Sequence, residues 1–209
     1  MKYKPFIGVA GNIGVGKTTF TNLVSKKLIL EPYYESVDDN PYLSDFYNDM
    51  KRWSFNLQIY FLQHRFKHHL EIMHKKNGVI QDRTIYEDTS IFAYNLYDMK
   101  IISKRDWDTY NNLFINMTQF LKKPDLIIYL KASTDTLIDR INNRNRNYEK
   151  DIDETYLHRL NIYYKNWISK IKDINVLTVD TNNFNIFKDV DKFDKICDEI
   201  KNQLKNNYK

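Results

Sequence analysis

The stretch "GNIGVGKTTF", residues 11–20, decides which fold this chain adopts. It satisfies the pattern G-x-x-x-x-G-K-[ST], in which glycines let backbone N–H groups surround phosphate oxygens and the lysine adds a positive charge. A strand-like run at 6–11 precedes the pattern and a helical run at 17–28 follows it, so the positive end of a helix faces the anion. The sequence therefore predicts a P-loop that binds a nucleoside triphosphate through Gly11, Asn12, Ile13, Gly14, Val15, Gly16, Lys17, Thr18 and Thr19.

Short apolar runs alternate with longer helical patterns along the rest of the chain. Strands are expected at 6–11, 78–82, 125–132 and 175–180, with a weaker one near 31–37. Helices are expected at 17–28, 52–75, 87–97, 105–121, 134–144 and 154–172, and a final amphipathic helix runs from Phe187 to Leu204. This alternation is typical of an α/β fold with a mainly parallel sheet. With 209 residues, the chain is expected to form a single domain over 1–209.

Composition points to a globular protein in a reducing compartment. Hydrophobic residues make up 42% of the chain and aromatic residues 15%, which argues against disorder. No run approaches the roughly 18 apolar residues that a membrane helix needs, and the N-terminus has no signal-peptide pattern. A single cysteine excludes a disulfide framework. We therefore expect a soluble cytoplasmic protein with no membrane partner.

The positive net charge raises the question of a nucleic-acid partner. The formal charge is +5, from 32 basic and 27 acidic side chains. No basic cluster is interleaved with aromatic residues, so a solvated lysine-rich surface is favoured over a nucleic-acid interface. The five histidines and the cysteine show no metal-site spacing.

An Asp-Arg pair ends the strand expected at 78–82. Asp82 is placed to hold Mg²⁺ directly or through water, and Arg83 to contact the transferred phosphoryl group or its acceptor. The alternative is a surface salt bridge, but the carboxyl ends of strands in such a sheet face the ligand crevice. A GTPase is not indicated, because the chain lacks an Asn-Lys-x-Asp tetrad that reads guanine.

Arginines concentrate in one stretch of a chain that otherwise uses lysine. The chain has 24 Lys and 8 Arg, yet residues 132–149 contain three arginines and no lysine: Arg140, Arg144 and Arg146. Planar guanidinium groups can clamp phosphate oxygens as charge spreads in the transition state, whereas the alternative is a solvated helix end. A lid that excludes water favours transfer to an acceptor over hydrolysis.

The acceptor is expected between the first and third strands. Gln58, Phe61, Leu62 and Arg65 recur at i, i+3, i+4 and i+7, which puts polar and aromatic groups on one helical face. After the third strand, Asp88 and Phe92 lie one turn apart. Arg65 paired with Asp88, beside Gln58 and Phe92, would form a pocket for a nucleobase. Considered separately, Phe92 also fits a position in the hydrophobic core, and the Arg65–Asp88 pair also fits a purely structural salt bridge.

These features together resemble the deoxynucleoside kinase family, in its deoxyadenosine, deoxyguanosine and deoxycytidine kinase branch. The resemblance runs nearly end to end through "GNIGVGKTTF", "ES" at 35–36, "FYNDMKRWSFNLQIYFLQHR", "QDRTIYEDTSIFAYNLY", "PDLIIYLKAS", "DRINNRNR", "YYKNWI" and "VLTVDTNNF". The compact, Asn-rich form looks most like small bacterial deoxyadenosine kinases. The resemblance implies a three-layer P-loop kinase fold, with a five-stranded parallel sheet flanked by helices and an arginine-rich lid over about 140–152.

The resemblance also implies an activity and roles for matching residues. The activity is ATP- and Mg²⁺-dependent phosphorylation of the 5′-hydroxyl of a deoxynucleoside in nucleotide salvage, by an enzyme that is usually a homodimer. Glu35 would take the hydroxyl proton, Arg83 would hold the hydroxyl and the phosphoryl group, and Lys17 would stabilise the developing charge. Thr18 and Asp82 would place Mg²⁺. The remaining nucleoside-binding residues would be Val37, Tyr47, Gln58, Phe61, Arg65, Asp88 and Phe92, and Asn182, Asn183 and Phe184 would lie against the adenine of ATP.

Two points of the resemblance are left open by the sequence. Glu31 in "LEP" mimics the family's Glu-Pro dipeptide, but it lies too close to Lys17 in sequence, so Glu35 is the expected base. The family's second 3′-hydroxyl ligand is a Glu directly before a Tyr-Leu pair, where this chain has Thr155, with Glu154 one residue earlier. We expect deoxyadenosine as the preferred acceptor, with deoxyguanosine and deoxycytidine as further candidates.

Two other functions compete with this interpretation. A nucleoside monophosphate kinase of the thymidylate kinase type shares the P-loop, the Asp-Arg pair and the lid. Its acceptor is a phosphate, which needs cations where this chain offers the Glu35 carboxylate. An ATP-dependent nucleic-acid-binding module would fit the pI of about 9.0 but lacks a basic-aromatic patch.

Overall fold

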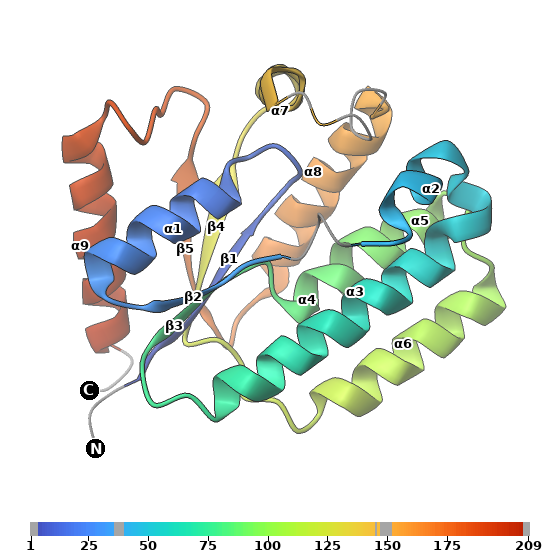
Figure 1. Cartoon of the computed structure of the whole chain (residues 1–209), viewed down its shortest axis with the longest axis horizontal. Helices are drawn as coiled ribbons and strands as arrows, with labels where there is room; N and C mark the ends of the chain where they lie inside the picture. Colours follow the sequence, from blue (N-terminus) through green and yellow to red (C-terminus); the bar gives the residue numbers. More distant parts are fainter. Residues whose placement is uncertain (1–3, 36–39, 145, 147–151, 207–209) are drawn as a thin grey trace.

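The computed structural model describes residues 4–35, 40–144, 146 and 152–206 (Figure 1). Within them, five strands form one parallel sheet in the order β2-β3-β1-β4-β5. The strands are β1 (Phe6–Gly11), β2 (Glu31–Tyr33), β3 (Val79–Asp82), β4 (Leu126–Lys131) and β5 (Asn175–Asp180). The predicted five-stranded parallel sheet is therefore confirmed.

Helices connect the strands and cover both faces of the sheet. They are α1 (Lys17–Leu28), α2 (Leu43–Asn48), α3 (Met50–Met73), α4 (Ile85–Glu87), the π-helix η1 (Asp88–Ala93), α5 (Tyr94–Asp98), α6 (Lys104–Thr118), α7 (Thr134–Arg144), α8 (Glu154–Lys170) and α9 (Val190–Asn206). Helices α1 and α9 lie on one side of the sheet, and α3, α5 and α8 lie on the other (Figure 1).

The two faces of the sheet contribute side chains to two separate hydrophobic clusters. Ile128 of β4 packs with α1 and α9 in the first, and its neighbour Ile127 packs with α3, α5 and α8 in the second. Successive side chains of a strand point to opposite faces, so a strand covered on both sides needs apolar residues at consecutive positions. This requirement accounts for the continuous run Leu126–Leu130, in which every residue is buried.

Three parts of the secondary structure differ from the expectation. The helix expected at 87–97 is three short helices, which begin at a capping box between Thr84 and Glu87. The strand near 31–37 ends at Tyr33, two residues before Glu35. Helix α2 was not predicted, and it forms because Leu43 and Phe46, one turn apart, bury their side chains in the second cluster.

The parallel topology brings the functional segments to one edge of the sheet. All five strands run in the same direction, so the P-loop after β1, Glu35 after β2 and Arg83 after β3 emerge at the same edge. Helix α7 begins after β4 and lies above this edge (Figure 1). Among the described residues, none of the helices combines the length and the apolar character needed to cross a membrane.

Candidate active site

The P-loop wraps around the start of α1 through glycines in left-handed conformations. Gly14 has φ 81°, and a β-carbon there would come within 2.8 Å of Ile141 Cγ1 in α7. Gly16 has φ 97° and is the N-cap of α1. A side chain at Gly14 would thus strain the backbone and push away α7, which carries Arg140 and Arg144.

Lys17, Thr18 and Asp82 form the phosphate end of the site. Lys17 is buried, and its Nζ donates to the carbonyl of Asn12 at 3.0 Å. Thr18 Oγ1 donates to Asp82 Oδ2 at 2.6 Å. The other oxygen of this carboxylate, Oδ1, is buried and has no hydrogen-bond partner among the described residues. A hydroxyl beside an under-coordinated carboxylate is a donor set that suits Mg²⁺.

Arg83 adopts a left-handed backbone conformation directly after β3. Its φ is 64°, which is uncommon for a residue with a side chain and costs free energy. The guanidinium lies 4.4 Å above the ring centroid of Phe92, and Nη2 donates to the carbonyl of Gly11 at 3.1 Å. The strained turn therefore aims Arg83 back over the end of β1, toward the P-loop.

Glu35 lies between two buried arginines. Its Oε1 accepts hydrogen bonds from Nη2 of Arg65 and, at 3.3 Å, from Nη1 of Arg83. Burial alone would raise the pKa of Glu35, but Arg83, Arg65, Lys17 and Arg146 together lower it to about 2. The carboxylate is consequently ionised over the working pH range and able to accept a hydrogen bond from a hydroxyl group.

Arg65 links Glu35 to a second carboxylate deeper in the site. Its Nη1 donates to Asp88 Oδ1, and its guanidinium lies 4.7 Å from the ring centroid of Phe61. Gln58 lies on the same helix and is buried, and its Oε1 has no hydrogen-bond partner within the part of the chain that the structure describes. An arginine, a carboxylate and an amide that line the same cavity can read the edge of a planar base.

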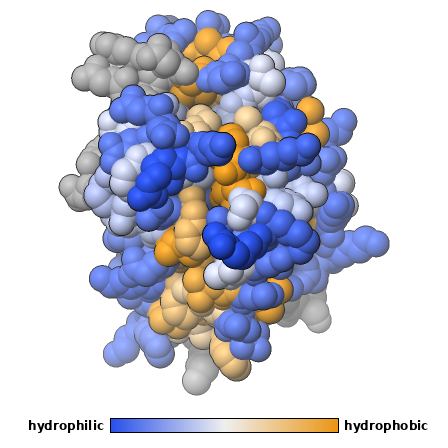
Figure 2. Space-filling view, turned by 90° about the vertical axis from the view of Figure 1, so that its right-hand side faces the viewer, coloured by the Kyte–Doolittle hydropathy of each residue, from blue (hydrophilic) through white to orange (hydrophobic). Residues whose placement is uncertain are grey.

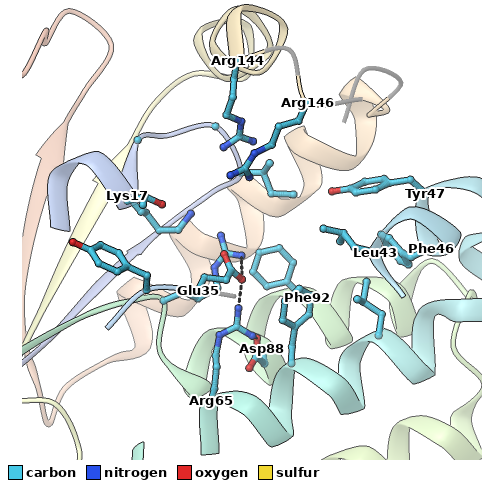
Figure 3. Close-up of a pocket in the computed structure, with 18 of the residues that line it drawn as sticks. Lys17, Glu35, Leu43, Phe46, Tyr47, Arg65, Asp88, Phe92, Arg144 and Arg146 are labelled. Atoms are coloured by element: carbon cyan, nitrogen blue, oxygen red, sulfur yellow. Dashed lines mark hydrogen bonds and ion pairs between the residues drawn. The ribbon is translucent and has the colours of Figure 1, made fainter. Parts of the chain in front are cut away.

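A cavity of about 580 Å³ joins the phosphate end to this polar cluster. Figure 3 shows Arg144 and Arg146 pointing into it from the side of α7, toward Lys17 and Glu35, with Tyr47 of α2 at its far side. Phe92 lies on the cavity wall beside Asp88. Residues expected to bind phosphate, to read the base and to form the lid thus line one cavity, among them Lys17, Asp88 and Arg144.

A second cavity, of about 490 Å³, lies on the other side of the P-loop and is lined by Asn182, Asn183 and Phe184. Arg140 borders both cavities. Its Nη1 donates to the Val15 carbonyl at 3.2 Å and to Thr181 Oγ1 at 3.0 Å. Of the three arginines expected in a lid, Arg140 therefore connects the P-loop to the segment after β5.

Some expected residues lie away from the main cavity. Glu154 is exposed at the first residue of α8 and does not line the cavity, whereas Tyr156 does. Asn12 turns its amide toward α8, where Nδ2 donates to the Leu157 carbonyl at 3.0 Å. Val37 and most of the expected lid after residue 144 are outside the described residues.

Other cavity-lining residues were not predicted. The apolar side chains of Leu43, Phe46 and Leu57 form part of the wall, and Tyr34 also lines the cavity. Leu43 and Phe46 carried a weak signal in "PYLSDFY", where apolar residues recur at i, i+3 and i+4. Glu87, which contacts the P-loop, was also missed, because an acidic residue in the first turn of a helix has an ordinary capping role.

Comparisons with known proteins agree with this geometry. A model of the deoxynucleoside kinase family matches residues 7–205. The chain belongs to the deoxynucleoside kinase family. A deoxyadenosine/deoxycytidine kinase of Bacillus subtilis is 40% identical over 205 residues, which cover 97% of this chain and 94% of the relative. A deoxyguanosine kinase of the same organism is 37% identical over 96% of this chain and 98% of its own length.

A solved structure agrees with both the family and the fold. The deoxyadenosine kinase of M. mycoides, with the products dCMP and a flexible dCDP bound, superimposes with a TM-score of 0.84 at 33% identity. The match covers 94% of this chain and 99% of that one. The predicted family, fold class and enzyme class are confirmed by these matches.

Proposed function

We propose that this deoxynucleoside kinase transfers the γ-phosphoryl group of ATP to the 5′-hydroxyl of deoxyadenosine, and also accepts deoxyguanosine or deoxycytidine. The observation that carries the proposal is the position of Glu35. Its carboxylate lies in the same cavity as Lys17 of the P-loop and next to the Arg65–Asp88 pair. A nucleoside with its base at Asp88 would direct its sugar hydroxyl toward Glu35 and the phosphates.

The mechanism relies on positioning and charge. Glu35 accepts a hydrogen bond from the 5′-hydroxyl and takes its proton as the bond from O5′ to the γ-phosphorus forms and the bond to the leaving ADP oxygen breaks. Lys17 and the lid arginines stabilise the charge on the phosphoryl oxygens. Thr18 and Asp82 would hold Mg²⁺, which supplies further charge neutralisation at the phosphates.

The proposed roles around the nucleoside follow from the lining of the cavity. Tyr47 would bind the 3′-hydroxyl. Tyr156 lines the cavity near the start of α8, whereas Glu154 does not. Phe92 and Phe61 would hold the faces of the base. Asn182, Asn183 and Phe184 border the second cavity, where the adenine of ATP would lie.

Transfer from γ-labelled ATP to dA, dG, dC, dT and dTMP, measured side by side, tests the proposed function. We expect label on dA, with weaker labelling of dG or dC and none on dTMP. Label on dTMP alone would contradict the proposal and favour a monophosphate kinase of the thymidylate kinase type. Salt-dependent retention on DNA would test the nucleic-acid alternative, and we expect no retention at physiological salt.

Asp88 should give deoxyadenosine binding an acid-side pH dependence. Burial raises the pKa of Asp88 to about 6, even though Arg65 acts in the opposite direction. A raised pKa means that the carboxylate gains its proton as the pH falls through about 6, and it then stops accepting from the base. The Kd for deoxyadenosine should therefore rise roughly tenfold between pH 7 and pH 5, because one proton is taken up.

Calorimetric titration with deoxyadenosine in the absence of ATP measures this dependence without a contribution from phosphate ionisation. The matched control is Asp88→Asn, whose amide does not titrate in this range. Its Kd should be higher but should not depend on pH between 5 and 8. A variant that keeps the wild-type pH dependence would show that another group is responsible.

We also propose that the enzyme is a homodimer. Helices α3 and α6 pack against each other and leave large apolar side chains more than a third exposed, namely Leu70, Met73, Leu113 and Ile115. Figure 2 shows apolar residues gathered in a band down one side of the molecule. Sedimentation should give twice the chain mass of 25.3 kDa, and the double substitution Leu70→Glu/Leu113→Glu should give the monomer. Ile29→Glu, at an exposed apolar site at the end of α1, should leave the dimer intact.

A further inference from the structure

Glu87 is a buried carboxylate beneath the active site that has no role in the proposed mechanism. It is the last residue of α4 and is 0% exposed. It lies five residues after Asp82 in sequence, yet its side chain contacts the start of the P-loop. Removing a carboxylate from water is costly, so its burial calls for compensating interactions.

Every hydrogen-bond partner of this carboxylate is a donor. Glu87 Oε1 accepts from the Thr84 N–H at 3.0 Å. Glu87 Oε2 accepts from the Gly11 N–H at 3.3 Å and from the Tyr164 hydroxyl at 2.7 Å. Burial raises the pKa of Glu87 above its ordinary value, although Arg83, Lys17 and the hydrogen bonds from Tyr164 and Thr84 act in the opposite direction. The geometry nevertheless fits the ionised form, because the carboxylate makes only acceptor contacts.

Glu87 also contacts the side chain of Arg83. Oε2 forms an ion pair with Arg83 Nε at 3.8 Å, too long for a hydrogen bond, whereas Glu35 pairs with a different nitrogen of the same group, Nη1. Arg83 in turn donates to the carbonyl of Gly11, whose N–H is bonded to Glu87. Gly11, Arg83 and Glu87 thus form a closed set of contacts between the end of β1 and the segment after β3.

These contacts can stabilise Arg83 in its unfavourable left-handed backbone conformation. A residue at φ 64° stays there only if its surroundings fix it. Glu35 is exposed to the cavity and is itself expected to change its hydrogen bonds when a hydroxyl group arrives, so it is a poor anchor. Glu87 is fully buried and does not line the main cavity, so we expect its contact with Arg83 to persist when the substrates bind.

We propose that Glu87 is a positioning residue for phosphoryl transfer, which holds the Arg83 guanidinium and the first glycine of the P-loop in a fixed relation. The inference rests on the proposed function, because it assigns to Glu87 the placement of a residue that touches the transferred group. It predicts that a change at Glu87 lowers the rate of the transfer step and leaves substrate binding largely intact, since Glu87 touches neither substrate.

The test compares two substitutions with a matched control. Glu87→Gln keeps the size of the side chain but removes its charge and one acceptor, and Glu87→Asp keeps the charge but draws it back by one methylene. Both should lower kcat for deoxyadenosine roughly 10- to 100-fold, with KM for deoxyadenosine and ATP within about threefold, since small misplacements of reacting groups act on this scale. Glu199→Gln is the matched control: it makes the same chemical change on α9, where Glu199 is exposed and accepts from Gln203, and kcat should stay within about twofold.

A double-mutant cycle separates positioning from a general effect on stability. If Glu87 acts through Arg83, then adding Glu87→Gln to the Arg83→Lys variant should cause less than about a threefold further loss of kcat, relative to Arg83→Lys alone. A merely structural role would give the same fold-loss in both backgrounds and would overturn the proposal. Melting temperatures identify variants that do not fold, and Glu87→Asp keeps the test decisive where Glu87→Gln is not recovered folded.

The outcomes also distinguish this inference from the function on which it rests. The wild-type enzyme is assayed in parallel with γ-labelled ATP and deoxyadenosine. If the wild type is active and the folded Glu87 variants have a normal kcat, only the proposed role of Glu87 is overturned. A wild type that transfers no label to any nucleoside would overturn the proposed function and, with it, the positioning role.

Discussion

Replacing Glu35 with glutamine is expected to lower kcat for deoxyadenosine by roughly 10²- to 10⁴-fold, the range that a general base contributes. The amide keeps the size of the side chain and one acceptor oxygen, but it cannot take the proton of the 5′-hydroxyl. The Kd for deoxyadenosine should change by less than about fivefold, because the loss falls on the transfer step and not on binding. Single-turnover transfer and calorimetric titration measure the two quantities separately.

Glu31→Gln is the matched control for this experiment. Glu31 is the other candidate base, in the chain's Glu-Pro dipeptide, and the structure pairs it with Lys75 on the surface, with its side chain 36% exposed. Its replacement should leave kcat within about twofold, as expected for an exposed ion pair. Near-normal turnover of Glu35→Gln would remove Glu35 from the role of base. A large loss in Glu31→Gln alone would move that role to the other carboxylate.

The low pKa of Glu35 is compatible with its proposed role. At a pKa of about 2 the carboxylate is a weak base toward bulk water. Phosphoryl transfer through a loose transition state needs little bond formation to the attacking oxygen at first, so the main requirement is a hydrogen-bond acceptor held in line. Glu35 meets this requirement at any pH above about 3, and an acid-side loss of binding near pH 6 therefore reports on Asp88.

The fold could be predicted from the sequence because its signals are local. The P-loop is defined by a fixed spacing of glycines, and the buried strands are continuous apolar runs. Helix α2 escaped prediction because it has only six residues and depends on packing against α3. The region after Arg83 was expected as one helix, since hydrophobic spacing cannot distinguish an α-helix from the π-helix turn that starts at Asp88.

The site was predictable where residues act along one element and less so where distant elements meet. Gln58, Phe61 and Arg65 could be read from helical spacing, and the structure gathers all three at the cavity. Glu87 could not be read in this way, because its partner Gly11 lies 76 residues away in sequence. The expectation for Glu154 was wrong because of the orientation of α8. The helix begins at Glu154, whose side chain lies on another face, and Tyr156, two residues later, lines the cavity instead.

One of the two substitutions Arg144→Gln and Arg146→Gln is expected to give a rate loss as large as that of Glu35→Gln. Both guanidinium groups point into the cavity above Lys17 and Glu35 (Figure 3). An arginine that stabilises the transferring phosphoryl group from within the same chain can be worth roughly 10³- to 10⁵-fold in rate. We expect substitution of the arginine that contacts the γ-phosphoryl group to lower kcat by at least about 10³-fold. Substitution of the other arginine should mainly raise KM for ATP.

Arg159→Gln is the matched control, because Arg159 of α8 bonds Asn95 and Asp98 away from the cavity. Its kcat should stay within about twofold, although its melting temperature should fall. The hydrolysis of ATP without a nucleoside gives a second readout, because a lid that excludes water protects ATP. Loss of the lid arginine should lower the ratio of transfer to hydrolysis as well as the transfer rate. If both variants keep normal kcat and this ratio, the two arginines belong to a solvated helix end and not to a lid.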